Sequence, residues 1–178
     1  DIVLMQCNTN YTASLENFKY INLNVLKAYS RKYPDTILGL SDHTPGHATV
    51  LGAVALGACV IEKHFTNDTS RDGPDHKFSM DFNSWKEMVD RTRELENALG
   101  LETKKVEDNE QETVILQRRS IRAKKDLMVG DLIYESDLEF LRPCPEDGLP
   151  PYELKNILNK KLTKGVKSGG YVKWTNIK

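Results

Sequence analysis

Short apolar runs alternate with helical patterns through the first hundred residues. Runs of four to six mostly apolar residues predict buried strands at 2–7, 37–41 and 59–62. Apolar positions that repeat every three or four residues predict helices at 22–32, 47–56 and 84–99. Because strands and helices alternate with short connections, we expect a parallel sheet with right-handed crossovers.

The last of these helices has the clearest end signals. Ser84 and Glu87 have the spacing of a capping box at its start, and Gly100 follows its last apolar residue.

Three strands cannot close a barrel, and an eight-fold barrel takes about 250 residues. We therefore expect residues 1–100 to be the last three units of a barrel. Since Asp1 leads directly into an apolar strand, we expect a fragment that is inactive alone.

The second part of the chain has a different pattern. Residues 101–117 are charged with few apolar positions, which predicts a linker. Short β-like runs at 120–123, 132–134, 139–141 and 171–174 surround one possible helix at 151–158. A unit of about 60 residues buries little surface, so we expect 118–178 to rest on a partner surface.

Composition narrows the class of protein. The 25 Lys and Arg nearly balance the 26 Asp and Glu, which argues against nucleic-acid binding and a polybasic membrane anchor. The longest apolar stretch, at 50–58, is far shorter than the roughly 20 residues that span a bilayer. Cys7, Cys59 and Cys144 lack CxxC spacing and are expected to be reduced thiols, so we expect a cytoplasmic protein.

Polar residues follow each predicted strand, at 8–11, 41–44 and 62–66. In parallel α/β folds the C-terminal strand ends form the ligand-binding face. Alternation of side chains places Ser41 and His43 on one side of their strand, and Glu62 and His64 on one side of the next.

The spacing of His43 and His64 allows two interpretations. Neighbouring strands lie about 4.8 Å apart, so both imidazoles can reach one divalent ion, and two His ligands with open positions suit a catalytic metal. Alternatively they are ordinary strand-end histidines. The loop at 71–76 is similarly either a lid that contacts sugar or phosphate, or a solvated turn. His47 and His76 have no expected role.

Several segments resemble a known family. Ser41-Asp42-His43-Thr44, Glu62-Lys63-His64-Phe65-Thr66 and the stretches 4–11, 57–61 and 73–76 resemble sialic acid synthases, namely N-acetylneuraminate, legionaminate and pseudaminate synthases. Residues 118–178 resemble their C-terminal antifreeze-like (SAF) domain, through 119–121, 125–127, 130–131 and 141–143. The resemblance implies an α/β fold: the C-terminal portion of a (β/α)8 TIM barrel, then a small β-rich SAF domain of β-clip type.

The resemblance also implies a reaction. The family condenses phosphoenolpyruvate with an N-acetylated mannose-type sugar and releases phosphate, using a divalent metal (Mn2+ or Mg2+), as a domain-swapped homodimer. On this basis His43 and His64 are the expected metal ligands. Glu62 is expected to stabilise charge or move a proton, or else to orient a metal-bound imidazole. Gln6 stands where many members have His, so its role stays open.

Substrate contacts follow from the same resemblance. Thr9 and Ser41 are expected to contact phosphoenolpyruvate. Tyr11 and Asp75 are expected to line the substrate pocket, with Asp75 on the sugar side. Arg142 is expected to reach the sugar from the partner's SAF domain.

Two other functions remain open from the sequence. One is a non-enzymatic carbohydrate-binding or assembly module, and the other is a different barrel enzyme that condenses phosphoenolpyruvate with an aldose. A binding module has no need of a metal beside Glu62, and the SAF domain argues against the second alternative. The acceptor sugar and the metal are not specified by the sequence.

Overall fold

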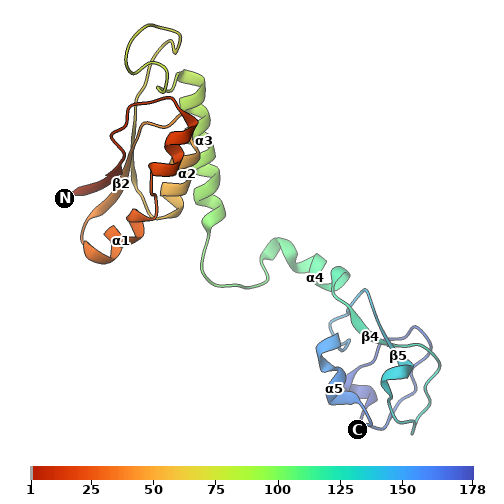
Figure 1. The fold of residues 1–178 in the computed structure, drawn as a ribbon. Helices are drawn as coiled ribbons and strands as arrows, with labels where there is room; N and C mark the ends of the chain where they lie inside the picture. Colours follow the sequence, from red (N-terminus) through yellow and green to blue (C-terminus); the bar gives the residue numbers. More distant parts are fainter. Residues whose placement is uncertain (1) are drawn as a thin grey trace. The chain divides into compact units, whose positions relative to one another are not determined.

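The computed structural model describes residues 2–178 and contains two compact units, which divide between Glu102 and Thr103. Both units are shown in Figure 1. Within residues 2–178, no helix is long and apolar enough to cross a membrane.

The first unit is a parallel sheet covered by helices. Strands β1 (Val3–Cys7), β2 (Ile37–Asp42) and β3 (Val60–Lys63) pair in the order β1-β2-β3, which confirms the predicted parallel sheet. Helices α1 (Val25–Lys32), α2 (Ala48–Ala55) and α3 (Phe82–Leu99) follow the three strands in turn, and a 3-10 helix at Leu15–Tyr20 precedes α1. Helices α2 and α3 lie side by side (Figure 1).

The core of this unit lies between the sheet and the helices. Leu38 and Leu40 of β2 are buried against side chains of all three helices, including Leu26, Val50 and Met88. Because alternate residues of a strand point to opposite faces, Gly39 and Ser41 belong to the other face of the sheet. That second face carries the polar strand ends.

Two expected features differ in the structure. Helix α3 begins at Phe82 rather than Ser84, with Asp81 as its N-cap and Ser84 as the reciprocal partner of the capping box. Glu87 therefore has no capping role. Part of the expected linker is ordered, because apolar residues let Gln111–Gln117 form helix α4, and the Cys144 amide donates to the Ile115 carbonyl.

The second unit has a small sheet and many single pairings. Strands β4 (Ser120–Ala123) and β5 (Leu138–Leu141) are antiparallel, and helix α5 (Leu154–Ile157) follows a 3-10 turn at Pro151–Glu153. Strands were wrongly expected at 132–134 and 171–174. Each segment forms a single β-bridge, because the 3-10 helices at Glu135–Asp137 and Trp174–Asn176 end the extended backbone before a second pairing can form.

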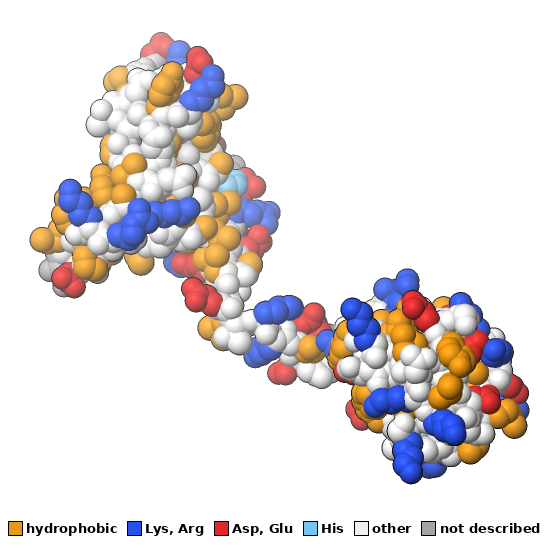
Figure 2. All heavy atoms as spheres, turned by 60° about the horizontal axis from the view of Figure 1, so that its bottom comes forward, with side chains coloured by type: hydrophobic (Ala, Val, Ile, Leu, Met, Phe, Trp, Pro, Cys, Tyr) orange, Lys and Arg blue, Asp and Glu red, His pale blue; other side chains and the backbone are white. Residues whose placement is uncertain are grey.

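The second unit nevertheless has a core of its own. Its fully buried side chains include Ile121, Ile133, Ile157 and Val172, from segments spread over the whole unit. Side chains of both charge signs lie on the exposed face of each unit seen in Figure 2, in keeping with the net charge of −1.

Candidate active site

Two histidines lie together at the C-terminal ends of neighbouring strands. His43 directly follows β2 and His64 directly follows β3, and the register pairs Ser41 with Glu62 and Asp42 with Lys63. The two ring centroids are 5.1 Å apart. The structure thus brings together the two imidazoles that the strand pattern placed on one face.

Each imidazole has an oxygen atom near its Nδ1, but only His43 forms a hydrogen bond there. The His43 Nδ1 lies 2.9 Å from the Asn8 carbonyl oxygen, and the His64 Nδ1 lies 3.5 Å from Asp75 Oδ2. A carbonyl oxygen only accepts, so the His43 Nδ1 carries the proton and a neutral ring keeps a lone pair on Nε2. Metal-bound histidines commonly donate their second N–H to a carbonyl or carboxylate in this way. The arrangement therefore fits a divalent ion bound through Nε2.

The described part of the chain supplies few further ligands. Within residues 2–178, no three His, Cys, Asp or Glu side chains gather closely enough to hold a metal. Two imidazoles with open positions leave room for substrate or water on an ion.

Two aromatic rings pack against the imidazoles. The Tyr11 ring lies 4.1 Å from His43, and the Phe78 ring lies 5.0 Å from His64 and 5.9 Å from His43. Tyr11 is 55% exposed, whereas Phe78 is 3% exposed. The sequence pattern did not mark Phe78, although it is the only large apolar residue between Thr66 and Ser79.

Ser41 and Glu62 lie on the same face of the sheet as the two imidazoles, two residues before His43 and His64. The Ser41 hydroxyl donates to Glu62 Oε1 at 3.1 Å across β2 and β3. Thr9 is exposed on the segment after β1, two residues before Tyr11. A carboxylate, two hydroxyls and two imidazoles therefore occupy the strand-end region of this unit.

The loop from Phe65 to Met80 begins and ends beside His64. Phe65 and Met80 form a parallel bridge, and the Met80 amide donates to the His64 carbonyl at 2.9 Å. His76, expected to have no role, pairs through Nδ1 with Thr66 Oγ1 at 2.8 Å and so fixes the loop that carries Asp75.

The same loop contains a carboxylate outside the site. Hydrogen bonds from the Ser70 hydroxyl and amide lower the pKa of Asp68.

Gln6 has a structural contact. Its Nε2 donates to the Ile21 carbonyl at 2.8 Å, and the Asn8 side chain donates to the Tyr20 carbonyl at 3.2 Å. These bonds hold the segment between β1 and α1, which carries Thr9 and Tyr11.

Two family models match the chain, one in each of its two units. Residues 1–104 match the NeuB family model, and residues 118–178 match the SAF domain. The chain belongs to the NeuB family. The resemblance to sialic acid synthases with a SAF domain is therefore confirmed.

Relatives of this NeuB-family chain include two curated bacterial synthases. The chain is 40% identical over 176 residues to N,N'-diacetyllegionaminic acid synthase of Legionella pneumophila, covering 99% of the chain and 48% of that relative. It is 36% identical over 173 residues to pseudaminic acid synthase of Campylobacter jejuni, covering 97% and 48%. The chain thus spans about half the length of the curated relatives it matches.

A solved structure agrees with this family. N-acetylneuraminic acid (sialic acid) synthetase of Leptospira borgpetersenii matches with a TM-score of 0.53 and 30% identity. The match covers 63% of this chain and 38% of that one.

Arg142 lies in the SAF domain of this NeuB-family chain. It is exposed and directly follows β5. The next carbonyl, of Pro143, accepts from the Ser120 hydroxyl and from Arg122 Nη2, each at 2.9 Å. The backbone beside Arg142 is thus anchored, while its side chain is exposed.

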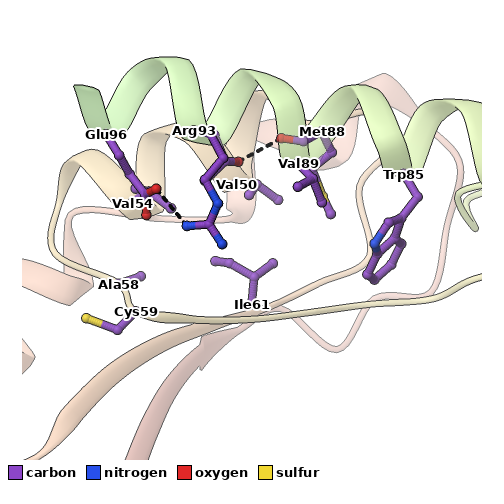
Figure 3. Close-up of a pocket in the computed structure, with 11 residues that line it drawn as sticks. Val50, Val54, Ala58, Cys59, Ile61, Trp85, Met88, Val89, Arg93 and Glu96 are labelled. Atoms are coloured by element: carbon purple, nitrogen blue, oxygen red, sulfur yellow. Dashed lines mark hydrogen bonds and ion pairs between the residues drawn. The ribbon is translucent and has the colours of Figure 1, made fainter. Parts of the chain in front are cut away.

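A separate hollow of about 240 Å3 lies between β3 and the two helices α2 and α3. Figure 3 shows Ile61 facing Val89 and Trp85 across it, with Arg93 close to Glu96. Since Ile61 alternates with Glu62 along β3, this hollow is on the opposite face from the imidazoles. Its walls are mainly hydrocarbon and carry one ion pair, so we assign it to packing.

Proposed function

We propose that the protein containing this chain condenses phosphoenolpyruvate with an N-acetylated mannose-type sugar and releases phosphate. The His43–His64 pair carries the proposal: the two rings lie 5.1 Å apart at the C-terminal strand ends, each with an oxygen atom near Nδ1, beside the Ser41–Glu62 pair. Family membership supports it, because curated relatives are synthases of legionaminic and pseudaminic acid. A carbohydrate-binding module without catalysis would need no such pair.

The proposed metal ligands are His43 and His64, each through Nε2. A divalent ion such as Mn2+ or Mg2+ would polarise the aldehyde oxygen of the open-chain sugar as a Lewis acid. The Asn8 carbonyl orients the His43 ring, and the Asp75 carboxylate, 3.5 Å from the His64 Nδ1, would orient the second ring once the ion is bound.

The other side chains divide between the two substrates. Ser41 and Thr9 offer hydroxyls to the phosphate or carboxylate of phosphoenolpyruvate. Tyr11 offers its exposed ring surface to the sugar, the buried Phe78 packs against the two imidazoles, and Asp75 accepts from the sugar hydroxyls.

The reaction would form two bonds, one C–C and one C–O, and break the C–O bond to phosphate. The enol carbon of phosphoenolpyruvate bonds to the aldehyde carbon, whose oxygen takes up a proton, and water adds to the cationic C2. The C–O bond to phosphate then breaks, so C2 becomes a ketone and phosphate leaves with the second proton of that water. Glu62, an exposed carboxylate that accepts from Ser41, is placed to stabilise the developing positive charge or to take the proton of that water.

We also propose that residues 2–178 are insufficient alone. Relatives are about twice as long as the matched part, and three strands provide only part of a substrate-enclosing barrel. Arg142 would reach the sugar of a neighbouring subunit, where a planar guanidinium suits an amide carbonyl or hydroxyls.

The test is phosphate release by the complete gene product that contains this sequence. We expect release that requires Mn2+, phosphoenolpyruvate and either N-acetylmannosamine or a 2,4-diacetamido-trideoxy-mannose sugar. His43→Ala and His64→Ala should each lower turnover by about a hundredfold or more, because metal polarisation contributes several kcal/mol. His47→Ala is the matched control: His47 is the α2 N-cap and makes no side-chain capping bond. Full turnover of both His43 and His64 variants in metal-stripped buffer contradicts the proposal.

A further inference from the structure

A buried ion pair lies directly behind the two imidazoles. Lys63 Nζ is 2.6 Å from Asp42 Oδ2, and the two side chains are 1% and 0% exposed. Asp42 is the last residue of β2 and immediately precedes His43, and Lys63 is the last residue of β3 and immediately precedes His64. By alternation, the ion pair is on the helix-facing side of the sheet while the imidazoles are on the other.

The pair belongs to a hydrogen-bonded network that includes backbone next to His43. Lys63 Nζ also donates to the Thr44 carbonyl at 2.6 Å, and Asp42 Oδ1 accepts from the Thr44 amide at 3.1 Å. The Thr49 hydroxyl, in the first turn of α2, donates to Asp42 Oδ2 at 2.5 Å. Asp42 and Thr44, the residues on either side of His43, are thereby hydrogen-bonded to Lys63 of β3, and Asp42 also to Thr49 of α2.

We propose that Asp42 and Lys63 are positioning residues that set the separation and orientation of His43 and His64. The inference rests on the proposed function and concerns how its metal ligands are held. Neither charged side chain is on the face that the substrates would occupy. Each acts through the backbone of the histidine that follows it.

Stability alone gives a weak reason for such a pair. Two charges lose their hydration on burial, and apolar residues of similar volume are often equally or more stabilising. Geometry gives a stronger reason, because a shift of one residue between β2 and β3 would turn His64 to the opposite face of the sheet. The observed register pairs Asp42 with Lys63, so the ion pair favours the one alignment that sets the imidazoles together.

The direct test removes both charges while keeping side-chain volume. Asp42→Leu combined with Lys63→Met is made in the complete gene product, and Mn2+ binding is titrated by electron paramagnetic resonance of the free ion. We expect a folded protein whose Mn2+ affinity is weaker by about ten- to hundredfold, as for other residues that orient metal-bound histidines. Val50→Ala, at the buried position next to Thr49 in α2 but outside the network, should lower stability and leave Mn2+ affinity unchanged.

A milder pair of variants covers the case in which the double variant does not fold. Thr49→Val removes one donor to Asp42, and Thr92→Val removes a comparable hydroxyl bond, to the Met88 carbonyl in α3. We expect Thr49→Val to weaken Mn2+ binding by about threefold, which is below the effect of a full positioning residue. Thr92→Val should have no effect.

The outcomes separate this inference from the proposed function. Unchanged Mn2+ affinity in the folded double variant, or equal affinities in the two threonine variants, overturns the positioning role while leaving the synthase proposal intact. If the unmodified protein binds no Mn2+, or if His43→Ala binds it normally, both proposals are wrong.

Discussion

Removing Lys63 alone should strongly destabilise the first unit. Lys63→Met keeps most of the side-chain length but deletes the ammonium that lies 2.6 Å from Asp42 Oδ2. The Asp42 carboxylate then stays fully buried with only hydroxyl and amide donors, from Thr44 and Thr49. Breaking a buried pair in this way costs about 3–5 kcal/mol, a large part of the 5–15 kcal/mol that stabilises a typical domain.

The chain offers a clean fluorescence assay for this loss. Of its two tryptophans, Trp85 packs against the core of the first unit and Trp174 lies in the second. In a Trp174→Phe background of the 178-residue chain, urea unfolding followed by fluorescence reports only the first unit. The free energy of unfolding should fall by about 3–5 kcal/mol for Lys63→Met and recover for the most part when Asp42→Leu is added.

Either of two results would refute the reasoning. A loss below about 1 kcal/mol is the size expected of an exposed ion pair and would mean that water reaches this one. A double variant no more stable than Lys63→Met would mean that the unpaired carboxylate is not the source of the loss.

Three further predictions concern a strand, a helix and the proposed role of Arg142 across subunits. Gly39→Ala should cost about 1–3 kcal/mol in the same assay, because a Cβ there would lie 2.9 Å from both the Val60 carbonyl oxygen and Met5 Cγ; an unchanged unfolding curve contradicts this. Hydrogen bonds from the Ser84 hydroxyl and amide lower the pKa of Asp81, so its stabilisation of α3 is present above about pH 4 and lost as the pH falls below that value. Helicity measured by circular dichroism should show this loss, and Asp81→Asn should flatten it. Mixing Arg142→Ala with His43→Ala subunits of the complete gene product should restore part of the activity that each lacks; if heterodimers form without activity, Arg142 does not act across subunits.

The periodic parts of the fold were predictable from the sequence. The expected strands differ from β1 and β2 by one residue at one end and from β3 by one residue at each end, because buried parallel strands are continuous apolar runs. The start of α3 was misplaced because Ser84 satisfies the capping pattern while the true N-cap, Asp81, precedes an exposed Phe82. Single bridges in the second unit carry no period, so the sequence cannot distinguish them from strands.

The candidate site was predictable only where side chains alternate. That rule placed His43 and His64 on one face, and the same rule puts Asp42 and Lys63 on the other. It does not reveal that the two charges pair, because pairing depends on the register of β2 and β3. Contacts from distant segments, such as Asn8 to His43 and Phe78 to both rings, depend on loop paths that have no sequence period.

Direct observation of metal-bound nitrogen tests the central claim most closely. The measurement is electron spin-echo envelope modulation of Mn2+ bound to the complete gene product, with histidine labelled by 15N or left as 14N. We predict couplings from two histidine nitrogens, and loss of one of them in His43→Ala and in His64→Ala but not in His47→Ala. Bound Mn2+ without histidine coupling, or coupling unchanged in both variants, would contradict the assignment of this strand-end pair as the metal site.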